Sequence, residues 1–403
     1  MKSEKTSPAV RYLAAAGNRI RQMRSDLPKL IDFGSAMARH LLAGGNLFPS
    51  AVSHWWPSEF SGRAGGLMGI RSADYVPASP HDVAWLTVPD PRYWIASSDE
   101  RFAALVKSPA KIFVNGRPQD VAGAAPAKRF SAFTDGAAPD DGWGACGRIS
   151  PLVSFRPLEQ IMRGWAAAGE MIGACIRGGR MPIIWMSVWL EGAFVRNAAF
   201  TEHNNLREPW SAPLFHNDRY IPPPAPGRIA SDYLDFIENI RQVLLAQADK
   251  LRLAGRWLAD ARRAGRRVFA VLVGHSYPAI LKPDYGPEYP VEFGPSASDL
   301  RRALPASLRE GDVAVHLGYG PTQPEDVRMW VEKGVRLIHS TPYGRMKGVK
   351  DHKNLIWLDL PWRPGDACVD LPGYGVRLLP SSSAADTLAY FAIMAEMVQS
   401  MGW

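Results

Sequence analysis

The sequence has few cysteines and no long apolar segment. Cys146, Cys175 and Cys368 lie far apart and show no C-x-x-C spacing, which argues against a disulfide framework or a zinc knuckle and favours buried thiols. No apolar run approaches the roughly 18 residues that a membrane span needs, and residues 1–8 are polar and charged. We therefore expect a cytoplasmic protein that does not contact membranes.

The sequence also lacks the motifs of metal, dinucleotide and nucleic-acid sites. Four histidines, His203, His316, His339 and His352, occur without H-x-x-x-H or H-x-x-E-H spacing, so we interpret them as structural or surface residues. Short G-x-G fragments lack the rest of a dinucleotide motif. The formal charge of +8 favours anionic partners, but no nucleic-acid reader motif accompanies it. We expect no cofactor, metal or nucleic acid.

What remains is a globular chain of 403 residues, with 46% hydrophobic and 21% charged residues. At one to two hundred residues per domain, this length predicts two or three domains.

Two stretches of the chain resemble each other at a constant separation. Y-L-A-A-A-G-N-R-I-R-Q begins at Tyr12 and Y-L-D-F-I-E-N-I-R-Q at Tyr233, 221 positions later. The same offset separates A-G-G-N-L-F from A-G-R-R-V-F, and the turn containing His54 from the turn containing His275. Three landmarks at one spacing predict an internal duplication of an αβ unit.

Both copies show apolar strand patterns between helical patterns. In the first copy the expected strands are 46–48, 83–88, 111–115 and 183–189, and the region 117–148 looks irregular. In the second they are 267–273, 312–317, 335–339, 355–360 and 367–371. The expected helices include 158–176, 324–333 and 384–401. Alternating strands and helices predict an α/β fold with parallel sheets covered on both faces, and ligands bind such sheets beyond the carboxyl ends of their strands.

At this point the chain resembles the sugar isomerase (SIS) family. Ser53, His54 and Glu59, followed by R-A-G-G at 63–66, are similar to the family pattern G-H-S-H, glutamate and R-A-G-G. In the second copy Gly274, His275 and Ser276 end a strand as in the family, and Ser381, Ser382 and Ser383 open the last helix. The repeat offset pairs His54 with His275, whereas the family pattern pairs Ser53 with Ser276, and the sequence leaves this open.

The resemblance implies two tandem three-layer αβα sandwiches with parallel sheets. We expect a divergent first SIS-like domain at 10–205, a proline-rich linker at 206–229 and a second domain at 230–403. Tandem domains could form a pseudo-twofold dimer within one chain. Further pairing into a homodimer is plausible, and the sequence does not fix it.

The phosphate-binding loop of the family, S-x-S-G-x-T, is altered here. The second copy has L-G-Y-G-P-T-Q at 317–323, which keeps Thr322, and the first has V-N-G-R-P-Q-D at 114–120, with Arg117 as its evident anion partner. A phosphate could be held by Arg117 or by Ser381 to Ser383, the ligand could be unphosphorylated, or the site could be inactive. Ser53, Ser276 and Thr322 complete the expected binding residues.

Aldose–ketose isomerisation needs a base that moves a proton between adjacent carbons. By resemblance the candidates are Glu59, His54, His275 and Glu325. For Glu325 we favour a helix-start role, because an acid there is stabilised by the helix dipole.

Two glutamates and a pair of tryptophans each allow two interpretations. Glu170 and Glu396 lie at matching places in the final helices of the two copies, and for both we favour a solvated helix face over a catalytic role. Trp55 and Trp56, beside His54, could stack on a sugar ring or pack a domain interface.

The leading hypothesis is therefore a tandem SIS protein that binds a sugar or sugar phosphate and isomerises an aldose to a ketose. The alternative is a non-catalytic carbohydrate-derivative sensor or scaffold that kept the fold. Convergence of His54, Glu59, His275 and Ser276 on one pocket favours the enzyme, and their dispersal or burial favours the sensor.

Overall fold

The computed structural model describes residues 7–50, 56–71, 77–88, 99–122, 125–134, 152–206, 208–274, 289–318, 320–340 and 345–403. The helices are α1 (Pro8–Ser25), α2 (Leu27–Leu42), α3 (Trp56–Phe60), α4 (Glu100–Lys107), α5 (Arg156–Arg177), α6 (Ala193–Ala198), α7 (Arg228–Leu245), α8 (Ala248–Arg263), α9 (Leu300–Ala303), α10 (Pro324–Glu332) and α11 (Ser382–Met401). The strands are β1 (Leu47–Pro49), β2 (Val83–Thr87), β3 (Lys111–Asn115), β4 (Phe130–Phe133), β5 (Val268–Leu272), β6 (Glu292–Phe293), β7 (Val313–Leu317), β8 (Arg336–Ser340), β9 (Leu355–Trp357), β10 (Ala367–Val369) and β11 (Leu378–Pro380). Short 3₁₀ helices lie at Pro118–Val121, Ala127–Arg129, Glu202–Asn204 and Pro209–Ser211.

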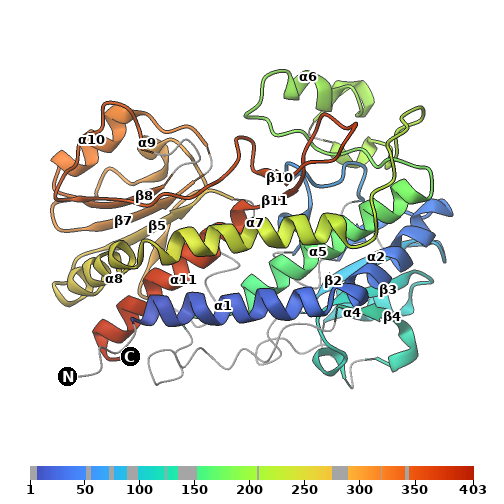
Figure 1. Ribbon diagram of the computed structural model, residues 1–403, viewed down its shortest axis with the longest axis horizontal. Coiled ribbons are helices and arrows are strands. Elements are labelled where there is room, and N and C mark those ends of the chain that lie inside the picture. The colour runs from blue at the N-terminus through green and yellow to red at the C-terminus, as the bar shows by residue number, and fades with distance from the viewer. Residues whose placement is uncertain are drawn as a thin grey trace.

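Two parallel sheets lie at opposite ends of the molecule (Figure 1). The first has the order β1-β2-β3-β4 and the second β6-β5-β7-β8-β9, with every described pairing parallel. The expected fold class, α/β with parallel sheets flanked by helices, is confirmed.

Both faces of each sheet are covered, as the strand patterns predicted. In β2, Val83 and Trp85 face the large core shared with the long helices, and the alternate residues Ala84 and Leu86 face a smaller core under α4. In the second sheet, α8 lies against β5, β7 and β9 on one face, and α9 and α10 cover the other. Alternation at period two therefore divides each sheet between two apolar layers.

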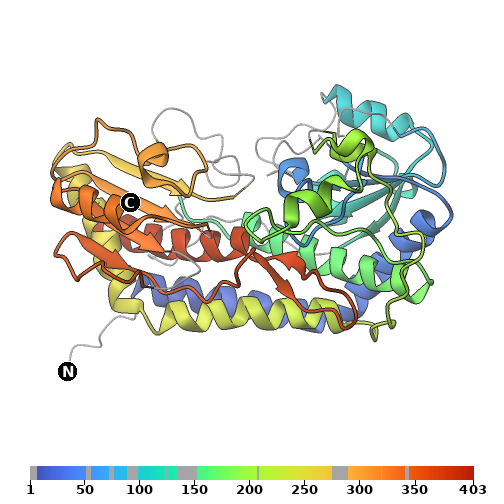
Figure 2. The same ribbon diagram turned by 90° about the horizontal axis from the view of Figure 1, so that it is seen from above.

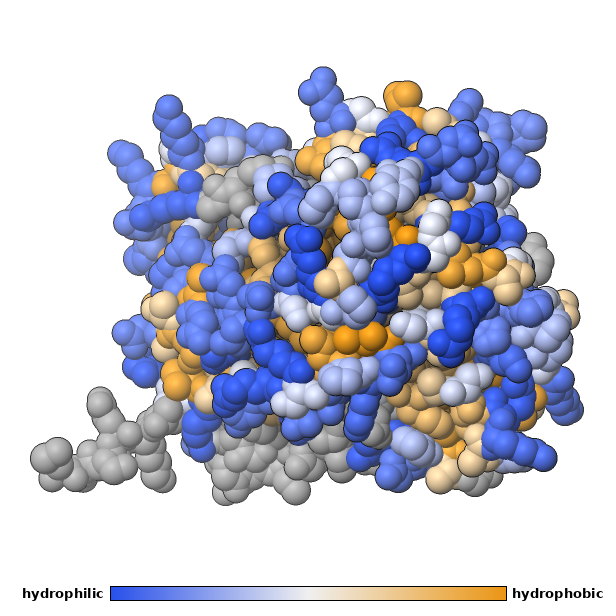
Figure 3. All heavy atoms as spheres, turned by 45° about the vertical axis from the view of Figure 1, so that its right-hand side comes forward, coloured by the Kyte–Doolittle hydropathy of each residue, from blue (hydrophilic) through white to orange (hydrophobic). Residues whose placement is uncertain are grey.

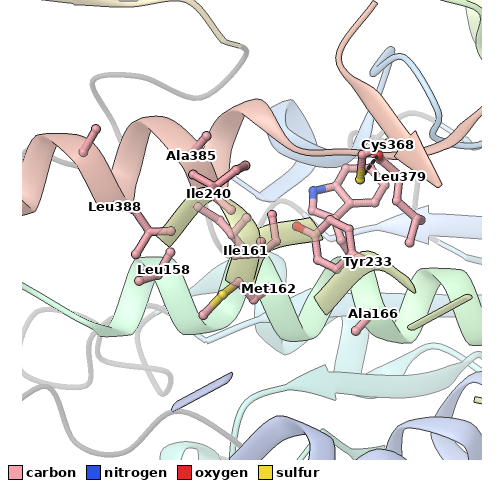
Figure 4. Packing of buried hydrophobic residues seen from close by; sticks show 14 of the residues in the cluster. Leu158, Ile161, Met162, Ala166, Tyr233, Ile240, Cys368, Leu379, Ala385 and Leu388 are labelled. Atoms are coloured by element: carbon pink, nitrogen blue, oxygen red, sulfur yellow. Dashed lines mark hydrogen bonds between the residues drawn. The ribbon is translucent and has the colours of Figure 1, made fainter. Parts of the chain in front are cut away.

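The first long helix of each half packs against the last helix of the other half. Helix α1 precedes the first sheet but lies along α11, and α7 precedes the second sheet but lies along α5. Figures 1 and 2 show α1 and α7 running side by side between the two sheets. The close view in Figure 4 shows Leu158 and Ile161 of α5 meeting Ile240 of α7 and Leu388 of α11 in one core.

Helices α2 and α8 approach the final helices closely at glycines. A Cβ at Gly34 would lie 2.5 Å from the backbone nitrogen of Met171, and a Cβ at Gly255 would lie 2.3 Å from Cβ of Glu396. The two glycines are 221 positions apart. The landmark spacing therefore coincides with equivalent helix crossings in the two halves.

Two expected strands differ from the observed fold. Residues 183–189 form no strand of the first sheet, because their backbone bonds go to the 65–68 loop and to Leu214 rather than to a sheet neighbour. The 367–371 strand is present as β10, but it pairs antiparallel with β11 in a separate two-stranded sheet. The region predicted to be irregular contains β4.

The surface carries both hydrophilic and apolar residues. Hydrophilic side chains cover most of the face in Figure 3, with apolar patches between them. No helix among the described residues is long and apolar enough to cross a bilayer.

Candidate functional site

A buried polar network lies where α11 begins. One carboxylate oxygen of Asp366, Oδ1, accepts hydrogen bonds from the backbone N–H groups of Ser381 at 3.0 Å and Ser382 at 2.7 Å. The other, Oδ2, accepts from the Ser382 hydroxyl and from Nη2 of Arg63, both at 3.0 Å. Asp366 therefore satisfies the first free donors of the helix while it binds a cation from the first half of the chain.

Arg63 links this helix start to Glu59. Nη1 of Arg63 lies 3.6 Å from Oε2 of Glu59, and both side chains are fully buried. Oε1 of Glu59 accepts from the indole N–H of Trp165 at 2.8 Å, and Oε2 accepts from the Ser383 hydroxyl at 2.7 Å. The predicted residues Glu59, Ser382 and Ser383 are thus brought together, but by hydrogen bonds inside the protein.

The glycine after Arg63 explains why R-A-G-G fits here. Gly65 has φ of +80°, and a Cβ on it would lie 2.6 Å from the backbone nitrogen of Leu379. The Leu379 N–H donates to the Gly65 carbonyl at 2.9 Å. Only glycine allows this backbone conformation and this approach to β11 without strain.

Asp386, one turn further along α11, is fully buried, and neither of its carboxylate oxygens has a hydrogen-bond partner among the described residues. Burial raises its pKa well above the usual value, and the nearby charges of Asp366 and Glu59 act in the same direction. The hydroxyl of Tyr233 beside the network is also buried without a partner, and burial raises its pKa.

A cavity of about 650 Å³ opens at the carboxyl ends of β5 and β7. In the order β6-β5-β7-β8-β9 these two strands flank the topological switch point, where ligands of α/β sheets bind. The lining is formed by 188–189, 273–274, 296–299, Arg302, Pro321 and Gln323.

Polar groups and one indole are displayed at this cavity. The Ser296 hydroxyl accepts from Gly274 N–H at 2.8 Å, and Oγ of Ser298 is buried without a partner. Arg302 is exposed and makes no ion pair with any described residue. Trp189, contributed by the first half, is 44% exposed. The site combines the Ser296 hydroxyl, a cation, an aromatic face and the carboxylate of Asp299, whose Oδ1 accepts from Arg301 N–H at 2.9 Å.

Thr322 holds together two loops beside the cavity. Its hydroxyl donates to the Ser298 carbonyl at 3.1 Å and ties the loop after β7 to the loop after β6. A Cβ at Gly320 would lie 1.9 Å from Ser298 Oγ, so the glycine that the altered loop retains permits this contact.

The other predicted residues are distributed as follows. Ser53, His54, His275 and Ser276 lie outside the described residues. Glu325 is confirmed at the start of α10, where it is exposed and pairs with Arg328 at 2.7 Å. Each of the remaining two has an internal partner: Ser381, whose hydroxyl donates to the Asp366 carbonyl at 3.0 Å, and Arg117, which pairs with Asp120 at 2.8 Å.

The interpretation of Glu170 and Glu396 as solvated helix residues is wrong. Glu170 accepts from the N–H groups of Gly227 at 2.8 Å and Ala230 at 3.1 Å, and Glu396 accepts from Ala9 N–H at 2.9 Å. Both are buried and hold the starts of α7 and α1. Burial raises the pKa of Glu170, although the two backbone donors oppose this change.

Trp56 is fully buried and packs against Trp85 of the first half, with 5.1 Å between the ring centroids, so it stacks neither on a ligand nor at a domain interface; Trp55 lies outside the described residues. His316 and His339 lie side by side on β7 and β8, with their Nδ1 atoms 3.0 Å apart. Burial lowers the pKa of His316 to about 4 and that of His339 well below its usual value. No metal-binding group of three or more His, Cys, Asp or Glu occurs in the described segments.

Sequence reasoning missed several residues of these sites. The S-x-S pattern sought after β7 occurs at 296–298, after β6, so a search of every strand end could have found it. Trp189 was assigned to a strand, and nothing in the local pattern of Asp366, Asp386 or Arg302 distinguishes them from ordinary surface charges.

No family model and no curated protein matches the chain. Among solved structures, the C-terminal domain of glucosamine-fructose-6-phosphate aminotransferase from Francisella tularensis is similar over 94% of this chain and 96% of its own, with 10% identity and a TM-score of 0.48. A putative phosphosugar isomerase from Silicibacter pomeroyi is similar over 98% of this chain and 99% of its own, with 10% identity and a TM-score of 0.46.

Proposed function

We propose that the protein binds a sugar or sugar phosphate in the cavity at the carboxyl ends of β5 and β7. The observation that carries this proposal is the set of groups gathered at a switch point: the exposed hydroxyl of Ser296, the unpaired cation Arg302 and the indole of Trp189. The volume of about 650 Å³ lies in the range of small-molecule sites.

Each group has a counterpart in such a ligand. An indole offers an apolar face to the C–H groups of a sugar ring, while the Ser296 hydroxyl and the amide of Gln323 exchange hydrogen bonds with its hydroxyls. Arg302 supplies donors suited to a phosphate or carboxylate oxygen. An anionic sugar uses all three elements, and a neutral sugar leaves Arg302 unused.

The cavity lies between parts of both proposed domains, 10–205 and 230–403. Trp189 comes from the first, and the serines and Arg302 come from the second. The crossed packing of α1 on α11 and of α7 on α5 supports two similar units that fold around one another.

Binding is tested by thermal shift with a panel of hexose phosphates, free hexoses, amino sugars and sugar acids, because a ligand of the folded state raises the melting temperature. Arg302→Gln should weaken binding of a phosphosugar about tenfold and leave a free sugar unaffected. Trp189→Leu should weaken both. Arg256→Gln, an exposed arginine of α8 away from the lining, is the matched control. Absence of a shift with every ligand, or unchanged affinity in Arg302→Gln, would contradict the site.

Aldose–ketose isomerisation is the proposed reaction at this site. Its test is exchange of the C2 proton of a bound aldose phosphate with deuterated solvent, which requires a base at that carbon. Exchange above the uncatalysed rate supports isomerisation.

A sensor is the second candidate function. It is favoured by Glu59, because both oxygens of this candidate base accept hydrogen bonds from inside the core. Ligand binding without any exchange would select the sensor.

A further inference from the structure

A second group of polar side chains, away from the cavity, surrounds the hydroxyl of Tyr374. Nη2 of Arg196 donates to this hydroxyl at 3.0 Å, and the backbone N–H of Ile184 donates to it at 3.3 Å. Nε2 of His216 lies 3.1 Å from the same oxygen. The guanidinium carbon of Arg219 lies 5.1 Å from the Tyr374 ring centroid.

The hydrogen-bond roles follow from counting lone pairs. A phenolic oxygen accepts two hydrogen bonds and donates one. Because Arg196 and Ile184 occupy both acceptor positions, the Tyr374 hydroxyl donates its proton to Nε2 of His216. The ring of His216 is then neutral and carries its proton on Nδ1, which has no partner among the described residues.

Two cations meet here without a carboxylate. Arg196 donates to the Ile184 carbonyl and, at 2.9 Å, to Oδ1 of Asn197, both neutral acceptors. Besides its contact with the Tyr374 ring, the side chain of Arg219 donates one long hydrogen bond of 3.5 Å to the Gly373 carbonyl. Neither guanidinium forms an ion pair in the described part of the chain. Burial lowers the pKa of Arg196; Tyr374 opposes this change, and the charge of Arg219 adds to it.

Arg196 is partly buried and Arg219 is exposed. A partly buried cation is normally paired with an anion, and the acceptors that Arg196 has here are all neutral. Nε of Arg196 makes no hydrogen bond and is not buried, so this donor faces solvent. Donors therefore remain on Arg196, Arg219 and His216, and no acceptor with a negative charge is supplied by the described chain.

We propose that Arg196, Arg219 and His216 form an anion site around Tyr374 that binds a phosphate group, separate from the cavity that contains Arg302. Guanidinium groups match the tetrahedral oxyanion in geometry and charge. The ligand is inorganic phosphate or the phosphate of a small phosphomonoester, which share this chemistry. The site is built from the 180–220 segment and the loop before β11, so occupancy stabilises the contact between them.

Inorganic phosphate is the first probe, titrated into the intact protein by calorimetry at low ionic strength, because salt screens exposed charges. Arg219→Gln should weaken binding about tenfold, and Arg256→Gln should leave it unchanged. Arg302→Gln removes the cation of the other cavity, so phosphate binding that survives this variant but not Arg219→Gln belongs to the Tyr374 site. If a phosphomonoester binds more tightly than inorganic phosphate and shows the same dependence on Arg219, the ligand of this site is a phosphomonoester.

A site-specific readout keeps the test independent of folding defects. The ring signals of His216, assigned by their absence in His216→Gln, should move on phosphate addition in the wild type and stay unmoved in Arg219→Gln. Unmoved signals in the wild type, or equal affinity of folded Arg219→Gln and wild type, would overturn this site and leave the sugar cavity untouched as a hypothesis.

Discussion

Asp386 provides a sharp test of how the buried network is balanced. Its carboxyl is fully buried, has no hydrogen-bond partner in the described part of the chain and lies near the carboxylates of Asp366 and Glu59, with Arg63 as the nearby cation. With one cation among three carboxyl groups, the network gains excess negative charge if Asp386 ionises. Replacement by asparagine keeps the shape of the side chain and removes this charge.

The sign of the effect follows from linkage. The pKa of Asp386 is raised in the folded state, whereas in the unfolded chain it is about 3.9. Below the unfolded-state pKa, Asp386 is protonated in both states, so its charge does not lower the free energy of unfolding. As the pH rises above this pKa, the folded protein loses about 1.4 kcal/mol per pH unit relative to Asp386→Asn, until the folded-state pKa is reached. At pH 7, about three pH units above the unfolded value, we therefore expect the variant to gain up to about 4 kcal/mol in unfolding free energy.

The assay is urea unfolding of wild type and Asp386→Asn between pH 4 and pH 8, followed by circular dichroism. The difference in unfolding free energy should be near zero at the acid end and should grow with pH. Asp232→Asn, whose side chain is 42% exposed and pairs with Arg228 on the surface, is the control, with an expected change below about 1 kcal/mol. A difference that does not depend on pH, or a variant less stable than wild type at pH 7, would refute the reasoning.

Two further predictions concern the crossed helices. Glu396→Ala removes the acceptor of Ala9 N–H and should cost about 1–2 kcal/mol, while Glu396→Gln should retain most of the stability; equal urea midpoints for the two variants would show that the cap contributes nothing. Gly255→Ala places a Cβ 2.3 Å from Cβ of Glu396 and should cost about 1–3 kcal/mol, whereas Gly375→Ala, with nothing within 4 Å of its Cβ, should be nearly neutral in the same melts.

Much of the architecture was predictable because it depends on local patterns. The strands around 268–272, 313–317 and 336–340 follow from short apolar runs, and the last helix follows from a long apolar segment without glycine or proline. The extended segment at 183–189 has the same pattern but pairs with loops, since strand membership depends on which distant backbone is adjacent. Local sequence carries no information about that choice.

The sites were less predictable for the same reason. Glu170 and Glu396 look like ordinary helix-surface glutamates, and only the exchange of α1 and α7 between the halves buries them against helix starts. Glu59 fits the family motif, yet its partners Trp165 and Ser383 are 106 and 324 positions away. The residue types showed which side chains can accept hydrogen bonds, but long-range packing determines which donors they meet.

The position of Trp189 has a consequence for either proposed function. This residue belongs to the first half of the chain but lines a cavity whose serines and Arg302 belong to the second. A ligand that contacts both binds most tightly at one relative position of the two halves, so its binding free energy depends on that position. The same halves are joined by the buried bonds from Asp366 to Arg63 and from Glu396 to Ala9. Whether or not a proton is transferred, a ligand in the cavity would bind across two halves whose relative position these buried bonds help to hold.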